Sequence, residues 1–295
     1  REIDPTQQGS VQQNEQSLSI AVCDLEKEDA RGAYRTLDFD IRNYKTIKMF
    51  VHAESELAQD NDMVAIMRVG TDLENNFYQY EVPLKLTPEG SADDRVIWPE
   101  SNEMIIDLDA FYNVKLNRQL NNTGNPNGYY SEILENGHKV SIIGLPDMSN
   151  VRTILLGVKN AQTSSQEKLC GEVWFNELRL VDFANRGGYA ANARLVAKLA
   201  DFANITVSGN YQTIGFGAID KKLNERNITE QLQYDVAANV QLGKFFPQKS
   251  GITVPMFIGY SENIVNPKFY PLNPDIELRT AIDNAESAIE KDAIR

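Results

Sequence analysis

Hydrophobic and polar positions alternate along two stretches in the second half of the chain. From 203 to 212, every odd position is apolar, aromatic or glycine, and every even position is polar. From 231 to 242, the even positions are apolar or aromatic, and the odd positions are polar except for one alanine. Looser runs of the same kind cover 192–199 and 252–260. Because successive side chains of a β-strand point to opposite faces, this pattern predicts four strands, each with one apolar and one polar face.

The preceding residues, 15–183, have a different pattern of apolar and polar positions. Short apolar or alternating runs are separated by turn residues, and only 108–120 has helical spacing. The run 63–69 is apolar at nearly every position, which predicts a strand buried on both faces. The run 77–86 contains Pro83, which predicts an edge or bulged strand. Several short strands with few helices favour an antiparallel β-sandwich, and we expect a jelly roll.

Residues 188–262 have two interpretations, a soluble sheet with one solvated face and a set of transmembrane barrel strands, because both would show this alternation. Strand length helps to distinguish them. A strand of a transmembrane barrel needs about 9–11 residues and turns its polar side chains toward a wet interior, and three of the four runs reach that length. Because the smallest bacterial barrels have about eight strands, these four would pair with strands outside this chain. We therefore expect a piece of a longer protein.

The predicted fold class is mainly β, with a jelly-roll-like antiparallel β-sandwich at 15–183 followed by four antiparallel strands of a large transmembrane β-barrel at 188–262. Residues 1–14 are expected to form a polar lead-in, and 263–295 a loop with a C-terminal helix. Parity assigns each side chain of the barrel strands to one face. The interior-facing, lumen-lining residues are then Arg194, Lys198, Asn210, Gln233, Asp235 and Asn239. The lipid-facing residues are Leu195, Leu199, Ile205, Val207, Tyr211, Leu232, Val236 and Val240.

Charge and composition narrow the classes of function. The 295 residues include 29 Lys or Arg and 42 Asp or Glu, which gives a formal net charge of −13. Nucleic-acid binding is not expected, because it requires a basic surface against phosphate. The sequence contains only two cysteines, Cys23 and Cys170. They either form one bridge, if they lie on neighbouring strands, or are two small buried side chains.

No recognisable catalytic motif is present, so we expect neither an enzyme nor a cofactor or metal site. The two histidines, His52 and His138, belong to no metal or nucleophile constellation, and His52 is expected to be a satisfied core or edge residue. No Walker loop, zinc spacing or nucleophile elbow occurs. An acidic run is usually a solvated edge, although its dense oxygen ligands could also hold Ca²⁺; its members are Asp24, Glu26, Glu28 and Asp29.

Four aromatic residues allow two interpretations. Tyr78, Tyr80, Trp98 and Trp174 could form a platform on which sugar rings stack, because jelly rolls often host lectin sites. They could equally be core residues. A cell-surface carbohydrate-binding β-sandwich is therefore the alternative to a membrane conduit.

Several motifs along the chain resemble those of the SprA/Sov family. The strongest are the run Gly171-Glu-Val-Trp-Phe-Asn-Glu-Leu-Arg-Leu180 and, after it, Gly187-Gly-Tyr-Ala-Ala-Asn-Ala-Arg194. Other similar segments are Asp29–Tyr34, Val96–Pro99, Gly144–Asp147, Thr213–Gly217 and Pro271–Asp275. The resemblance covers nearly the whole chain, and the members of this family are far longer.

The resemblance implies a gliding-motility and secretion protein of the cell outer membrane, the translocon of the type IX secretion system. It implies a very large single-chain barrel with soluble insertions, through which folded cargo passes. The implied partners are secreted cargo proteins, accessory outer-membrane and periplasmic proteins of the secretion system, and outer-membrane lipid. Transport would be passive in this chain, because it contains no nucleotide site, and the family offers no catalytic residues to transfer.

Overall fold

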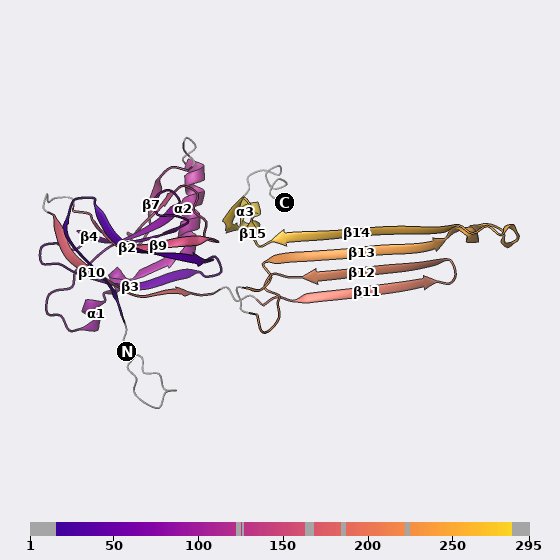
Figure 1. Ribbon diagram of the computed structural model, residues 1–295, viewed down its shortest axis with the longest axis horizontal. Coiled ribbons are helices and arrows are strands. Elements are labelled where there is room, and N and C mark those ends of the chain that lie inside the picture. The colour runs from indigo at the N-terminus through magenta and orange to yellow at the C-terminus, as the bar shows by residue number, and fades with distance from the viewer. Residues whose placement is uncertain are drawn as a thin grey trace, which may run out of the picture. The chain divides into compact units, whose positions relative to one another are not determined.

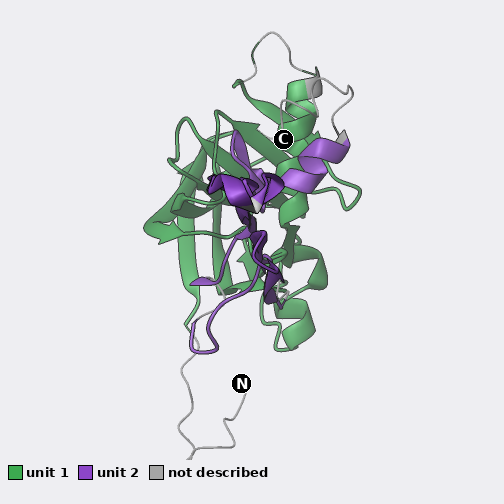
Figure 2. Ribbon diagram, turned by 90° about the vertical axis from the view of Figure 1, so that its right-hand side faces the viewer, with its two compact units in different colours: residues 1–184 green, residues 185–295 purple. Residues whose placement is uncertain are grey.

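The computed structural model describes residues 16–121, 125, 127–162, 168–183, 187–221 and 225–284. The chain divides into two compact units, residues 1–184 and 185–295, which Figure 2 shows in green and purple. Both are built mainly from antiparallel strands (Figure 1), so the prediction of a mainly β fold is confirmed. Among the described helices, none is long and apolar enough to cross a membrane. The expected polar lead-in lies outside the described residues.

Unit 1 contains two antiparallel sheets. In spatial order, the first sheet consists of β1 (Leu18–Leu25), β10 (Leu169–Val181), β3 (Thr46–Glu54) and β6 (Met104–Asp107). The second consists of β2 (Ala30–Phe39), β9 (Val151–Asn160), β4 (Met63–Gly70), β5 (Phe77–Pro83), β8 (Lys139–Ile143) and β7 (Tyr130–Ile133). This arrangement is a β-sandwich, as the spacing of the short strands predicted.

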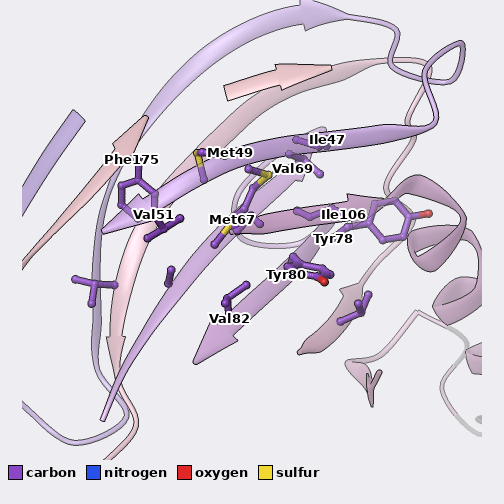
Figure 3. Close-up of a cluster of buried hydrophobic side chains, with 14 of the residues drawn as sticks. Ile47, Met49, Val51, Met67, Val69, Tyr78, Tyr80, Val82, Ile106 and Phe175 are labelled. Carbon is purple, nitrogen blue, oxygen red and sulfur yellow. The ribbon is translucent and has the colours of Figure 1, made fainter. Parts of the chain in front are cut away.

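The core of unit 1 lies between the two sheets. Met49 and Val51 of β3 face Met67 of β4 and Tyr80 of β5, as Figure 3 shows. Each of these four side chains is at most 1% exposed. Burying a large apolar side chain contributes about 1.5–3 kcal/mol, so these buried side chains stabilise the sandwich. β4 is buried at every position except Arg68, and the predicted burial on both faces is confirmed.

Helix α2 (Leu108–Asn121) matches the helix predicted at 108–120. Its Phe111 is fully buried and stacks on Tyr78 of β5, with ring centroids 5.0 Å apart. Two short helical segments precede it, α1 (Asp94–Ile97) and η1 (Glu100–Asn102). The aromatic stack anchors α2 to the sandwich.

The prediction of an edge or bulged strand at Pro83 was wrong. β5 is an interior strand that pairs with β4 on one side and with β8 on the other. Pro83 is its last residue and lies opposite Val64, beyond the ladder with β8, which ends at Glu81. The proline therefore removes no hydrogen bond from the β5–β8 ladder, and a strand end tolerates it as well as an edge does.

A disulfide joins the two cysteines, which decides between the alternatives left open by the sequence. Cys23 lies on β1 and Cys170 on the neighbouring strand β10, with Cα atoms 4.0 Å apart. The bond connects positions 147 residues apart and ties the beginning of the sandwich to its last strand.

Unit 2 contains an open sheet of four long antiparallel strands. They are β11 (Ala190–Leu199), β12 (Ala203–Gln212), β13 (Thr229–Gln241) and β14 (Pro255–Pro267), in chain order across the sheet. Three residues connect β11 to β12, and the short helices η3 (Leu242–Phe245) and η4 (Gln248–Ser250) lie between β13 and β14. Each of the two outer strands, β11 and β14, has one edge that no described strand pairs with.

The fourth strand differs from the predicted run at 252–260. Residues 252–254 precede β14, and the carbonyl of Val254 accepts a hydrogen bond from the N–H of Leu242 instead of joining the strand ladder. The strand then continues to Pro267, into the segment expected to be a loop. It is followed by β15 (Phe269–Tyr270), β16 (Asn273–Glu277) and α3 (Leu278–Asn284). Residues 285–295 of the expected helix lie outside the described residues.

Candidate functional site

The cross-strand register of β11–β14 lines up residues of the same character. Leu195 lies opposite Val207, Val207 opposite Val236, and Val236 opposite Tyr260. Directly opposite residues in antiparallel strands point to the same face of the sheet. The parity predicted for each strand separately is therefore in phase across all four strands.

The register places the predicted residues on two opposite faces of this sheet. All eight side chains predicted to face lipid lie on one side, called here the apolar face: Leu195, Leu199, Ile205, Val207, Tyr211, Leu232, Val236 and Val240. All six predicted to line the lumen lie on the other side, called here the polar face: Arg194, Lys198, Asn210, Gln233, Asp235 and Asn239.

The apolar face is exposed in unit 2. Leu195 is 66% exposed, Ile258 55% and Leu199 48%. A soluble sheet normally covers such a face with a second layer, and contiguous exposed apolar patches mark contact with a partner or a membrane. Within the described part of unit 2, the sheet has the surface of an interaction face and lacks the burial of a core.

The polar face carries amides, hydroxyls and charges in adjacent rows. Ser261 donates a hydrogen bond to the Asp235 carboxylate at 2.5 Å, and the Gln231 side chain donates to Asn263 Oδ1 at 3.1 Å. A shallow hollow of about 310 Å³ opens over this region, lined by Asn192, Ala193, Arg194, Ser208, Gly209, Asn210, Gln233 and Asp235. A face with this many donors and acceptors is suited to contact with water.

Two carboxylates on the apolar face were not predicted. Glu262 accepts hydrogen bonds from the hydroxyls of Tyr234 and Tyr260, and Glu230 accepts one from Tyr211. The predicted fourth run ended at Tyr260, so its parity was not followed to position 262. Extending the alternation by one step along β14 would have placed Glu262 on this face.

Two glycine motifs, Gly187-Gly188 and Gly215-Phe216-Gly217, meet at the start of the connection between β12 and β13. A Cβ atom on Gly188 would lie 2.0 Å from the backbone nitrogen of Phe216. The connection closes on itself, because the N–H of Gly215 donates to the Asn227 carbonyl and the N–H of Asn227 to the Phe216 carbonyl. The segment before β11 and the base of this long connection are thus packed backbone against backbone.

We expect Gly188→Ala to destabilise this contact by about 1–3 kcal/mol, the usual range for forcing atoms into a packed site. Limited proteolysis should then cut the 213–228 connection faster than in the unmodified chain. Gly187→Ala is the matched control, because a Cβ there meets nothing within 4 Å. Equal cleavage rates for the two variants would contradict the expectation.

A protein-family model, SprA_N, described as motility related/secretion protein, matches residues 1–282. The chain belongs to this family. No curated protein matches it. Membership of SprA_N supports a role in secretion or motility, and it confirms the family resemblance carried by the glycine-rich and Trp174-containing motifs.

In this SprA_N chain, the histidine and acidic-run candidates contact other residues of the fold. His52 is 2% exposed, and its Nδ1 lies 2.8 Å from the carbonyl of Ile97, to which it can donate. The Glu28 carboxylate forms an ion pair with Lys159, and the hydrogen bond from Lys159 lowers the pKa of Glu28. Asp29 pairs with Arg31 at 2.7 Å. Among the residues the structure describes, no three His, Cys, Asp or Glu side chains are grouped to hold a metal ion.

The four aromatic candidates for a sugar platform do not come together. Tyr78 and Tyr80 are each 1% exposed in the core, where no sugar ring could stack on them. Trp98 and Trp174 each contact His52, with ring centroids 5.8 Å and 4.5 Å from the imidazole. Core packing therefore accounts for the two tyrosines, which belong to one buried cluster, and the two tryptophans each pack against the same histidine instead.

Proposed function

We propose that this chain is part of an outer-membrane conduit through which secreted proteins pass, and that the β11–β14 sheet is a piece of the conduit wall. The supporting observation is the register, which sorts the residues of four long strands onto one exposed apolar face and one polar face. The strands contain 10 to 13 residues, and about 9–11 are enough to cross a bilayer. Membership of a secretion and motility family agrees with this role.

In the proposed wall, the apolar face meets lipid and the polar face meets the water through which cargo moves. The free edges of β11 and β14 would pair with further strands, because an unpaired edge leaves backbone N–H and C=O groups unsatisfied in hydrocarbon. The chain itself acts passively and catalyses no reaction. Its partners would be secreted cargo and accessory outer-membrane and periplasmic proteins.

We propose that the sandwich of unit 1 is a jelly roll. The strand order β1-β10-β3-β6 in one sheet and β2-β9-β4-β5 in the other alternates between the sheets as two Greek keys require. The β7–β8 hairpin then extends the second sheet beyond β5. The disulfide of this unit is consistent with an oxidising compartment outside the cytoplasm.

The conduit is tested by obstructing it from one face. Cysteine introduced as Asn210→Cys on the polar face, and modified in cells with a polyethylene glycol maleimide of about 5 kDa, should reduce the amount of secreted protein in the medium. Gln233→Cys lies directly opposite Asn210 and should act in the same way.

The control for this experiment is Val207→Cys on the apolar face. It should react poorly, because a charged or hydrated reagent does not enter hydrocarbon, and secretion should continue. The conduit proposal is wrong if both polar-face sites are fully modified and secretion is unchanged.

A further inference from the structure

The apolar face carries polar groups from the end where β13 begins to the middle of the β13–β14 ladder. Near that end, Tyr211 donates a hydrogen bond to Glu230. Close to the ladder midpoint, where Glu262 lies opposite Tyr234 and Tyr260 opposite Val236, both tyrosines donate to Glu262. The ring of Tyr189 also lies 5.9 Å from that of Tyr211. These residues form what we call the tyrosine–glutamate cluster: Tyr189, Tyr211, Glu230, Tyr234, Tyr260 and Glu262.

The opposite end of the sheet is marked by different residues. Phe202 and Phe245 contact edge to face, with centroids 5.2 Å apart. Beside them, Lys244 forms an ion pair with Asp201 at 3.0 Å. Aromatic rings beside a pair of charges again end the apolar surface, which is the composition found at the boundary between hydrocarbon and headgroups.

Between Glu262 and this opposite end, the rows of the apolar face contain almost only hydrocarbon. One row joins Ala197, Ile205, Ala238 and Ile258, and the next joins Leu199, Ala203, Val240 and Met256. An ionised carboxylate such as Glu262 is unfavourable in hydrocarbon and is found where water or headgroups reach it. The apolar face therefore presents hydrocarbon without charged groups only between Glu262 and the Asp201–Lys244 pair.

From the positions of these groups we infer where the sheet sits in the bilayer, an inference that rests on the proposed function. The hydrocarbon layer contacts the apolar face only between Glu262 and the Asp201–Lys244 pair, and Glu262 and the cluster residues beyond it, Tyr189, Tyr211 and Glu230, lie among lipid headgroups. Along the chain this interval runs from Tyr234 of β13, which lies opposite Glu262, to Leu242, the first residue of η3; positions 234 to 242 are nine residues. Spanning strands need about 9–11 residues, so the interval is long enough.

This placement is off-centre in the sheet. The β13–β14 ladder runs from Thr229 opposite Pro267 to Gln241 opposite Pro255, so its midpoint is Asp235. The inferred hydrocarbon interval is instead centred on Ala238. Residues 229–233 then project beyond the hydrocarbon, and two of the residues predicted to face lipid, Tyr211 and Leu232, contact headgroups.

The inference is tested by measuring depth with nitroxide labels. Leu232→Cys and Val240→Cys are each introduced into the full-length protein, labelled, and reconstituted in vesicles of phosphatidylethanolamine and phosphatidylglycerol. Collision with oxygen is compared with collision with a water-soluble nickel complex. Because Val240 lies two residues from the inferred centre and Leu232 six, the Val240 label should be deeper by about 9 Å, at about 3.3 Å per residue and a tilt of about 45°.

Two different results separate failure of the inference from failure of the proposed function. If the hydrocarbon layer is centred on the ladder midpoint, the Leu232 label will be the deeper one, and the inferred boundary is overturned. Polar-face labels at Gln231→Cys and Asn239→Cys should collide freely with the nickel complex in either case. If the Leu232 and Val240 labels collide with it just as freely, the sheet does not cross a bilayer and the proposed function fails.

Discussion

Replacing Cys23 and Cys170 with serine should lower the free energy of unfolding of the sandwich by about 2–5 kcal/mol. The disulfide connects positions 147 residues apart, so it removes a large amount of conformational freedom from the unfolded chain, and that restriction favours the folded state. Both tryptophans of the chain, Trp98 and Trp174, lie in this unit. Their fluorescence during a guanidinium titration of the whole chain therefore reports the unfolding of the sandwich.

A reducing agent provides the control for the serine variant. Dithiothreitol should lower the unfolding midpoint of the unmodified chain to that of the Cys23→Ser, Cys170→Ser variant, and it should leave the variant unchanged. Identical midpoints for the oxidised chain and the variant would show that the bond adds nothing to stability.

Replacing Ile205 with arginine should destabilise the membrane-inserted protein by about 2–4 kcal/mol, the range for a basic residue on the lipid face near the bilayer midplane. Ile205 lies on the apolar face directly opposite Ala238, at the centre of the inferred hydrocarbon interval. The guanidinium would have to be buried in hydrocarbon or draw water and headgroups toward it. The measurement is denaturant-dependent folding of the full-length protein into lipid vesicles.

Thr206→Arg is the matched control for this substitution. Thr206 is the next residue on the same strand, and it points to the polar face beside Ala237 and Val196. Its arginine would lie in water, so the effect on stability should be small. Equal losses at 205 and 206 would show that the two faces meet the same medium, which a membrane-crossing strand does not allow.

The local alternation of residue types was sufficient to locate the four long strands and assign their faces, although the fourth strand begins and ends later than its predicted run. Between 203 and 212 the parity is unbroken, and a strand has only two sides, so each side chain could be assigned without knowing its neighbours. Helix α2 was found in the same way from its different spacing. The carboxylates Glu230 and Glu262 were missed because they lie where the predicted runs had stopped, although their parity already placed them on the apolar face.

Properties that depend on contacts between distant segments came only from the tertiary structure. Pro83 predicted an edge or bulged strand, and the pairing of β5 with both β4 and β8 showed that the proline instead ends an interior strand. Whether Cys23 and Cys170 form a bond depended on β1 and β10 becoming neighbours across 147 residues. The contacts of Trp98 and Trp174 with His52, and the burial of Tyr78 and Tyr80, likewise depended on the packing of segments far apart in the sequence.

The sequence by itself determined that this chain is mainly β, and it determined which side chain of each long strand points to which face. The reason is that side-chain direction along a strand is a local property with a period of two residues. The alignment of the strands with one another came from the tertiary structure, and with it the meeting of Tyr234, Tyr260 and Glu262 near the middle of the β13–β14 ladder. Register between strands is set by non-local hydrogen bonding and packing, which the alternation within a single strand does not specify.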